Sequence, residues 1–107
     1  MARQPKRKTK TEFREALPLT LHRQWFEAIV AGKKKTEYRV NKAYWRKRLE
    51  GVSYREVHFR NGYATNAPFA RVEYKGLRKF GKGPGSYFGI RLGRILEVRH
   101  FKLSPRR

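Results

Sequence analysis

The chain has 107 residues, of which 28 are Lys or Arg and 8 are acidic, so its formal net charge at pH 7 is +20. This length suits one domain with a single core, and a hydrophobic content of 38% excludes wholesale disorder. Such an excess of one charge opposes compaction unless a polyanion relieves it. Nucleic acid is therefore the expected partner, ahead of an anionic membrane surface.

The residue types that are missing exclude several kinds of site. The chain contains no cysteine, which excludes disulfides, a thiolate nucleophile and a cysteine-based zinc site. Its histidines are scattered, so we expect no metal and no cofactor. No apolar run approaches the roughly 18 residues of a spanning helix, and no apolar stretch follows the basic start as in a secretory signal. We therefore expect a cytoplasmic protein with no membrane association and no obligate protein partner.

Two basic tails are expected to flank one domain. Residues 1–12 are polar and basic with almost no apolar content, which is typical of a flexible tail that touches phosphates. A purely solubilising tail has the same composition, so both interpretations stay open. The domain is expected over residues 13–103, followed by a short basic tail at residues 104–107.

The first elements read as a strand and a helix. Residues 17–21 alternate leucine with proline or threonine, as an edge strand does. Residues 21–31 then place five apolar side chains, including Trp25, on one continuous helical face, with Thr20 as the N-cap. Gly32 stands where a helix commonly ends on a left-handed residue.

The remaining elements are predicted in the same way. Residues 35–40 read as a strand, and Asn41 is a suitable N-cap for a helix over residues 42–50. Alternating segments follow, with a turn at Asn61-Gly62. These strands are expected at residues 56–60, 70–74, 88–92 and about 95–101. Five or six strands with two helices indicate an α+β domain.

The most informative stretch has the pattern G-x-K-x-x-E-x-R and runs from Gly32 to Arg39. Side chains two apart on a strand share a face, so Lys35, Glu37 and Arg39 are expected to line up, with Lys34 reaching over the helix end. A carboxylate between two cations stays ionised and orients Arg39 toward a phosphate or a base edge. A charge network that only pins the helix to the sheet has the same pattern, and the two interpretations are compatible.

Together with Leu17–Leu21 and Tyr87–Ile95, this motif resembles the ASCH domain, a small branch of the PUA-like superfamily associated with RNA. The resemblance implies a small PUA-like mixed β-barrel of five to six strands with two or so helices. It also implies a cleft between the first helix and the barrel. Lys34, Glu37 and Arg39 would border that cleft, where a nucleotide or RNA would sit.

The same resemblance leaves an enzyme open. Some relatives hydrolyse N4-acylated cytidine, and ribonuclease activity is attributed to others. In either case the catalytic residues would be Lys34, Glu37 and Arg39. Lys34 matches the lysine of the amidohydrolases, whereas Glu37 stands where those enzymes have a threonine.

Cations for a nucleic-acid backbone come from the motif, from the second predicted helix and from a later basic run. They are Lys33, Lys34, Lys35, Arg39, Arg46, Lys47, Arg78 and Lys79. Tyr44 and Trp45 lie among the helical cations, as in base-stacking surfaces, although Trp45 and Leu49 are also spaced as a core pair. The main hypothesis is a module that binds nucleic acid, with RNA favoured over DNA. The alternatives are an enzyme at the cleft and a ribonucleoprotein component that fills gaps between phosphates.

Overall fold

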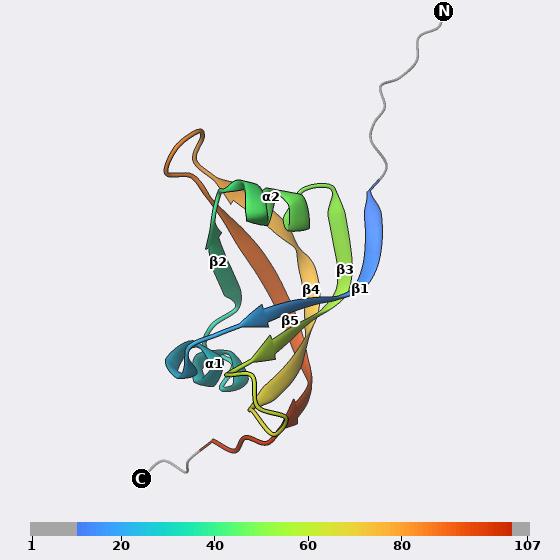
Figure 1. The fold of residues 1–107 in the computed structure, drawn as a ribbon, viewed down its shortest axis with the longest axis vertical. Helices are drawn as coiled ribbons and strands as arrows, with labels where there is room; N and C mark the ends of the chain where they lie inside the picture. The colour runs from blue at the N-terminus through green and yellow to red at the C-terminus, as the bar shows by residue number, and fades with distance from the viewer. Residues whose placement is uncertain (1–10, 104–107) are drawn as a thin grey trace, which may run out of the picture.

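The computed structural model describes residues 11–103, which form five strands and two helices (Figure 1). In chain order the elements are β1 (Glu12–Thr20), α1 (Arg23–Val30), β2 (Thr36–Val40), α2 (Ala43–Leu49), β3 (Val52–Arg60), β4 (Phe69–Phe80) and β5 (Tyr87–Arg99). This arrangement confirms the predicted α+β class. The predicted tails lie outside the described residues except at their inner margin, where Glu12 already belongs to β1. Among the described residues, no helix is long and apolar enough to cross a membrane.

All five strands form one mixed sheet in the order β1-β3-β4-β5-β2. β1 runs parallel to β3, whereas the other three neighbouring pairs are antiparallel. The sheet is strongly curved in Figure 1, as in a PUA-like barrel. The barrel is not closed, because β1 and β2 remain the two edges of the sheet.

The core lies inside this curved sheet and is filled by alternating side chains. In β1, Leu17 and Leu19 are buried and Pro18 between them is exposed. Pro18 is tolerated because β1 pairs with a neighbour on one side only. The largest fully buried side chains come from both helices and from every strand except β2: Phe26, Phe59, Phe88, Leu17, Leu49, Ile90, Val57 and Val72.

The two helices have the predicted positions but not the predicted N-caps. His22 and not Thr20 precedes α1, and Lys42 and not Asn41 precedes α2; neither side chain makes a capping hydrogen bond. Asn41 instead donates from Nδ2 to Ser86 Oγ at 2.8 Å. The amide therefore ties the start of α2 to the β4–β5 connection.

The second half of the chain has fewer and longer strands than predicted. The segments predicted as two strands at residues 88–92 and 95–101 belong to the single strand β5, and β4 extends to Phe80. The β4–β5 ladder contains three register shifts, one of them next to Gly76, whose φ is +130°. A bulge lets a strand continue past an extra residue that has no partner. The local sequence does not reveal where such bulges occur.

The connection between β3 and β4 is also longer than the predicted Asn61-Gly62 turn. Residues 61–68 form this loop, and the Asn61 backbone N–H donates to Pro68 O at 3.0 Å to close it. The Asn61 side chain donates to Leu21 O at 2.9 Å. Asn61 and Gly62 therefore begin a longer loop, and the asparagine connects this loop to the residue that follows β1.

A charged network links the neighbouring strands β3, β4 and β5. Arg71 donates to Glu56 at 2.7 and 2.9 Å and to Glu97 at 2.9 Å. His58 Nε2 lies 2.8 Å from Glu56 Oε1. The hydrogen bonds from Arg71, followed by that from His58, lower the pKa of Glu56 to about 2. Glu56 therefore remains ionised in the folded protein far below its ordinary titration range.

We expect the free energy of unfolding to fall as the pH is lowered from about 4.5 toward 2. The folded-state pKa of Glu56 is depressed, so its contribution is complete above the unfolded value of 4.5 and is lost as the pH falls through the folded value. Urea unfolding across this range should show a shallower pH dependence for Glu56→Gln than for the wild type. Glu15→Gln, which changes an exposed carboxylate, is the matched control and should retain the wild-type dependence. An unchanged dependence in Glu56→Gln would contradict this assignment.

Candidate nucleic-acid interface

The motif side chains Lys34, Glu37 and Arg39 meet around a buried carboxylate. Glu37 in β2 is 6% exposed. Lys34 Nζ lies 3.3 Å from its Oε1, and Arg39 NH2 lies 2.8 Å from its Oε2. Arg39 also donates from Nε to Oε2 at 3.0 Å. Each oxygen of the carboxylate therefore faces one cation, and we call these three residues the Glu37 triad.

The turn between α1 and β2 places Lys34 over Glu37. Gly32 adopts a φ of +79°, and the next two backbone N–H groups, of Lys33 and Lys34, both donate to Ala28 O. Lys34 Nζ then donates to Thr36 O at 2.7 Å. Lys35 was expected beside Glu37 but is exposed, and Lys34 takes that place.

Arg39 connects the two edges of the open sheet. Its NH2 group donates to Thr20 O, at the end of β1, at 3.3 Å. Its Cζ lies 4.9 Å from the ring centroid of Trp45 in α2. Within residues 11–103, Arg39 NH1 makes no hydrogen bond. The hydrogen bonds of Nε and NH2 and the contact with Trp45 hold the rest of the guanidinium in place.

Aromatic rings flank the Glu37 triad on the α1 side. Lys34 Nζ lies 5.4 Å from the ring centroid of Trp25 and 5.2 Å from that of Tyr38. Trp25 is 45% exposed, so its assignment to the buried face of α1 was wrong. Phe26, its neighbour in sequence, takes the core position instead and is 1% exposed. Trp45 packs partly against the core. This agrees with the alternative in which Trp45 and Leu49 form a core pair.

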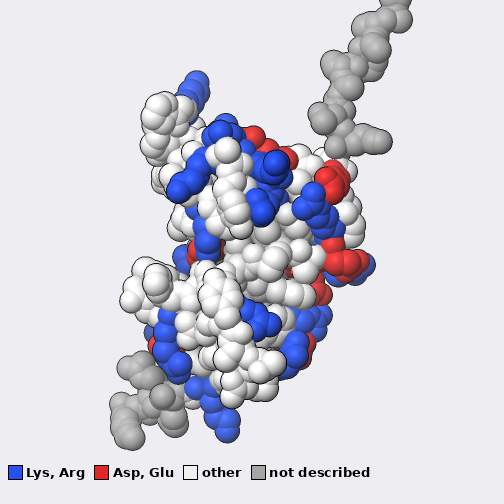
Figure 2. All heavy atoms as spheres, viewed as in Figure 1, with Lys and Arg blue, Asp and Glu red and all other residues white. Residues whose placement is uncertain are grey.

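The other predicted cations fall into separate groups. Arg46 and Lys47 are exposed on α2, and Figure 2 shows Lys and Arg side chains gathered over this end of the molecule. Arg46 NH1 donates to Asn41 Oδ1 at 2.8 Å. Lys79 lies on β4, with its Nζ 3.5 Å from Glu50 Oε2 at the end of α2. Arg78 precedes Lys79 in β4 and therefore points to the other face of the sheet.

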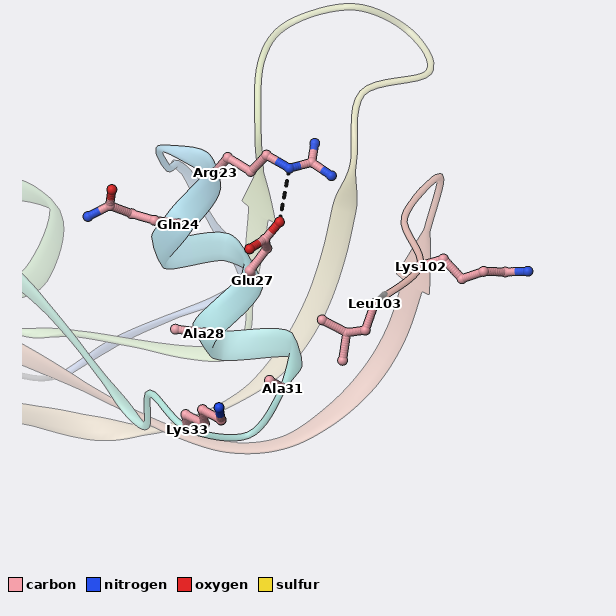
Figure 3. A pocket seen from close by; sticks show the side chains of 8 residues that line it. All are labelled: Arg23, Gln24, Glu27, Ala28, Ala31, Lys33, Lys102 and Leu103. Carbon is pink, nitrogen blue, oxygen red and sulfur yellow. Dashed lines mark hydrogen bonds and ion pairs between the residues drawn. The ribbon is translucent and has the colours of Figure 1, made fainter. Parts of the chain in front are cut away.

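Two cavities border the end of α1. The larger, of about 490 Å³, lies between α1 and the segment after β5 (Figure 3) and is lined by Arg23, Gln24, Glu27, Ala28, Ala31, Lys33, Lys102 and Leu103. The smaller, of about 130 Å³, includes Lys34 and Lys35 in its lining. Neither has Glu37 or Arg39 in its lining, so Lys34 is the one member of the Glu37 triad that borders either of these cavities.

The Glu37 triad is better suited to holding cations than to transferring protons. A general acid or base needs an oxygen that exchanges a proton with substrate, and both oxygens of Glu37 are already paired with cations. No group of three or more His, Cys, Asp or Glu side chains fit to hold a metal occurs in the part of the chain that the structure describes.

A family model for the ASCH domain matches residues 19–66, which include the whole triad and α2. This part of the chain is therefore similar to ASCH domains. ASCH domains are PUA-like and are generally linked to RNA binding. The matched region ends before Arg78 and Lys79. No curated protein and no solved structure matches the chain.

Replacing Glu37 with glutamine should lower the free energy of unfolding by about 3 kcal/mol, because two largely buried cations lose their counter-charge. Urea unfolding at neutral pH measures the change. Glu15→Gln is the matched control, because Glu15 pairs with Arg55 at the surface, and its effect should stay within about 0.5 kcal/mol. Equal losses in the two variants would show that the Glu37 triad contributes no more than a surface ion pair.

Proposed function

We propose that this protein binds RNA over the surface between α1 and α2, with Arg39 and the exposed cations of α2 contacting phosphates. The observation that carries the proposal is the Glu37 triad, in which a buried carboxylate holds Lys34 and Arg39 beside aromatic rings. Cations fixed in this way bind an anion with little loss of side-chain entropy. The match of residues 19–66 to the ASCH domain model supports the same class of ligand.

The charge balance supports a polyanionic ligand. All eight acidic residues of the chain lie within 4 Å of a basic side chain. Over the described residues, no glutamate is therefore left without a basic neighbour, and the Lys and Arg side chains outnumber the glutamates. Nucleic acid supplies a continuous row of phosphates that relieves this repulsion, whereas a small anion neutralises only one or two charges.

Exposed aromatic rings on the two helices favour RNA with unpaired bases. Trp25 is 45% exposed beside Lys34, and Tyr44 is 54% exposed with Arg48 Cζ 3.6 Å from its ring centroid. Specific RNA recognition uses such rings and guanidinium planes to stack bases that are not paired. We therefore favour single-stranded or looped RNA over duplex DNA.

The affinity for RNA should fall steeply with salt. If about five phosphates are contacted, the slope of log affinity against log salt should be about −3.5 to −4.5. Fluorescence anisotropy with a labelled RNA measures this slope. The Arg46→Ala/Lys47→Ala variant should bind more weakly at low salt, with a slope flatter by about 1.5, because two phosphate contacts are removed.

The control for this measurement removes the same charge elsewhere. Arg14→Ala/Arg55→Ala takes two cations from the β1–β3 side of the sheet, where each pairs with a glutamate. This variant should retain the wild-type slope within error. If both double variants flatten the slope equally, binding follows net charge alone and the surface between the helices is not the site.

An enzyme at the same residues is the second candidate. It would cleave RNA or deacylate N4-acylated cytidine, and the observation in its favour is the 3.3 Å separation of Lys34 Nζ and Glu37 Oε1. Incubation of labelled RNA with the protein in EDTA should leave the RNA shifted but intact on a gel. Cleavage that co-purifies with the protein and disappears in Lys34→Ala would establish a ribonuclease, and release of the acyl group from N4-acetylcytidine would establish the deacylase.

A further inference from the structure

Three aromatic side chains from three neighbouring strands pack together on the sheet, and we call them the aromatic platform: Tyr38 of β2, Phe80 of β4 and Tyr87 of β5. The rings of Phe80 and Tyr87 are stacked, with centroids 5.0 Å apart and an angle of 17° between their planes. The Tyr38 ring lies 5.8 Å from Tyr87 and 6.1 Å from Phe80. Phe80 and Tyr87 are direct partners in the β4–β5 ladder.

The aromatic platform lies outside the core. Glu37 and Phe88, which neighbour Tyr38 and Tyr87 in sequence, are buried, so alternation places the two tyrosines on the opposite face of the sheet. Tyr38 is 51% exposed and Tyr87 is 41% exposed. Gly89, opposite Tyr38 in the ladder, makes room for the rings, because a Cβ there would lie 2.8 Å from Phe80 Cε2.

Among the described residues, the charged groups that lie close to the rings of the aromatic platform are cations. Lys34 Nζ lies 5.2 Å from the Tyr38 ring centroid, and Arg78 Cζ lies 5.7 Å from that of Phe80. Arg91 is exposed and lies two residues beyond Gly89, on the same face of β5. Two nearby glutamates lie away from the rings. Glu37 is buried on the inner face of the sheet. Glu50 pairs with Lys79, which precedes Phe80 in β4 and therefore points to the opposite face.

We propose that this aromatic platform stacks unpaired bases of single-stranded RNA. The inference rests on the proposed function and adds a second, base-binding surface to it. Flat rings bordered by cations suit nucleotides, because each base offers a π-face to a ring and each phosphate a charge to a neighbouring cation. Lys34 contacts the rings of both Trp25 and Tyr38, so one RNA strand can pass around edge strand β2 from the surface between the helices to the aromatic platform.

The test compares single-stranded and duplex RNA by fluorescence anisotropy. Tyr38→Ala/Tyr87→Ala should bind a labelled uridine decamer at least about tenfold more weakly than the wild type, because stacking on two rings is lost. Its affinity for a fully paired RNA duplex should change less than about twofold, since duplex bases are not available to stack. Its salt slope should match the wild type, because no cation is removed. Tyr38→Phe/Tyr87→Phe, which keeps the rings, should retain wild-type affinity.

The matched control is Phe13→Ala/Tyr63→Ala, which removes two exposed aromatic rings away from the platform and should leave binding unchanged. If the wild type binds no RNA, the proposed function itself fails. If the wild type binds the decamer and Tyr38→Ala/Tyr87→Ala binds equally well, only the aromatic platform is overturned. A wild-type dimer in sedimentation that dissociates in this variant, with RNA affinity unchanged, would identify the surface as a contact between two copies of the chain instead.

Discussion

The buried carboxylate of Glu37 is the interaction on which the open side of this sheet depends. β2 is an edge strand without a large fully buried apolar side chain, and its ladder pairs it only with β5. Arg39 joins it to Thr20 of β1, and Lys34 joins it to the turn after α1. The hydrogen bond from Arg39 to Thr20 thus spans the gap where a closed barrel would have a ladder. Because burying a carboxylate costs several kcal/mol, its use here fits a role in fixing two cations in position rather than in adding stability alone.

The cations of this protein fall into two kinds, those held in ion-pair groups and those exposed on α2. The two most connected ion-pair groups, around Glu37 and around Glu56, involve different parts of the sheet and tie neighbouring strands together. The exposed cations of α2 belong to neither group, although Arg46 is oriented by Asn41. Structural cations and exposed cations are therefore separate populations. If the proposed function holds, removing an exposed cation should weaken RNA binding with little effect on the fold, whereas removing Arg39 should disturb both.

The sequence predicted the local features well and the non-local ones poorly. Gly32 and the spacing of Lys34, Glu37 and Arg39 are signals contained within a few residues, and the structure brings those three side chains together. The lengths of β4 and β5 depend on bulges whose positions are set by pairing between strands. The aromatic platform was not predicted for the same reason. Phe80 and Tyr87 meet only because of the β4–β5 register, and Tyr38 joins them only because β2 pairs with β5.

Edge strand β2 gives the molecule two different faces from five residues. Alternation directs Glu37 and Arg39 toward the interior and the helices, and it directs Tyr38 and Val40 outward. The inner face therefore presents a fixed guanidinium, and the outer face presents an aromatic ring. A nucleotide offers both a phosphate for a cation and a base for a flat surface, and a single strand exposes both. A duplex cannot do so, because its bases are paired and stacked within the helix. The alternation of one short strand thus suits the proposed ligand, a single-stranded RNA that contacts both surfaces.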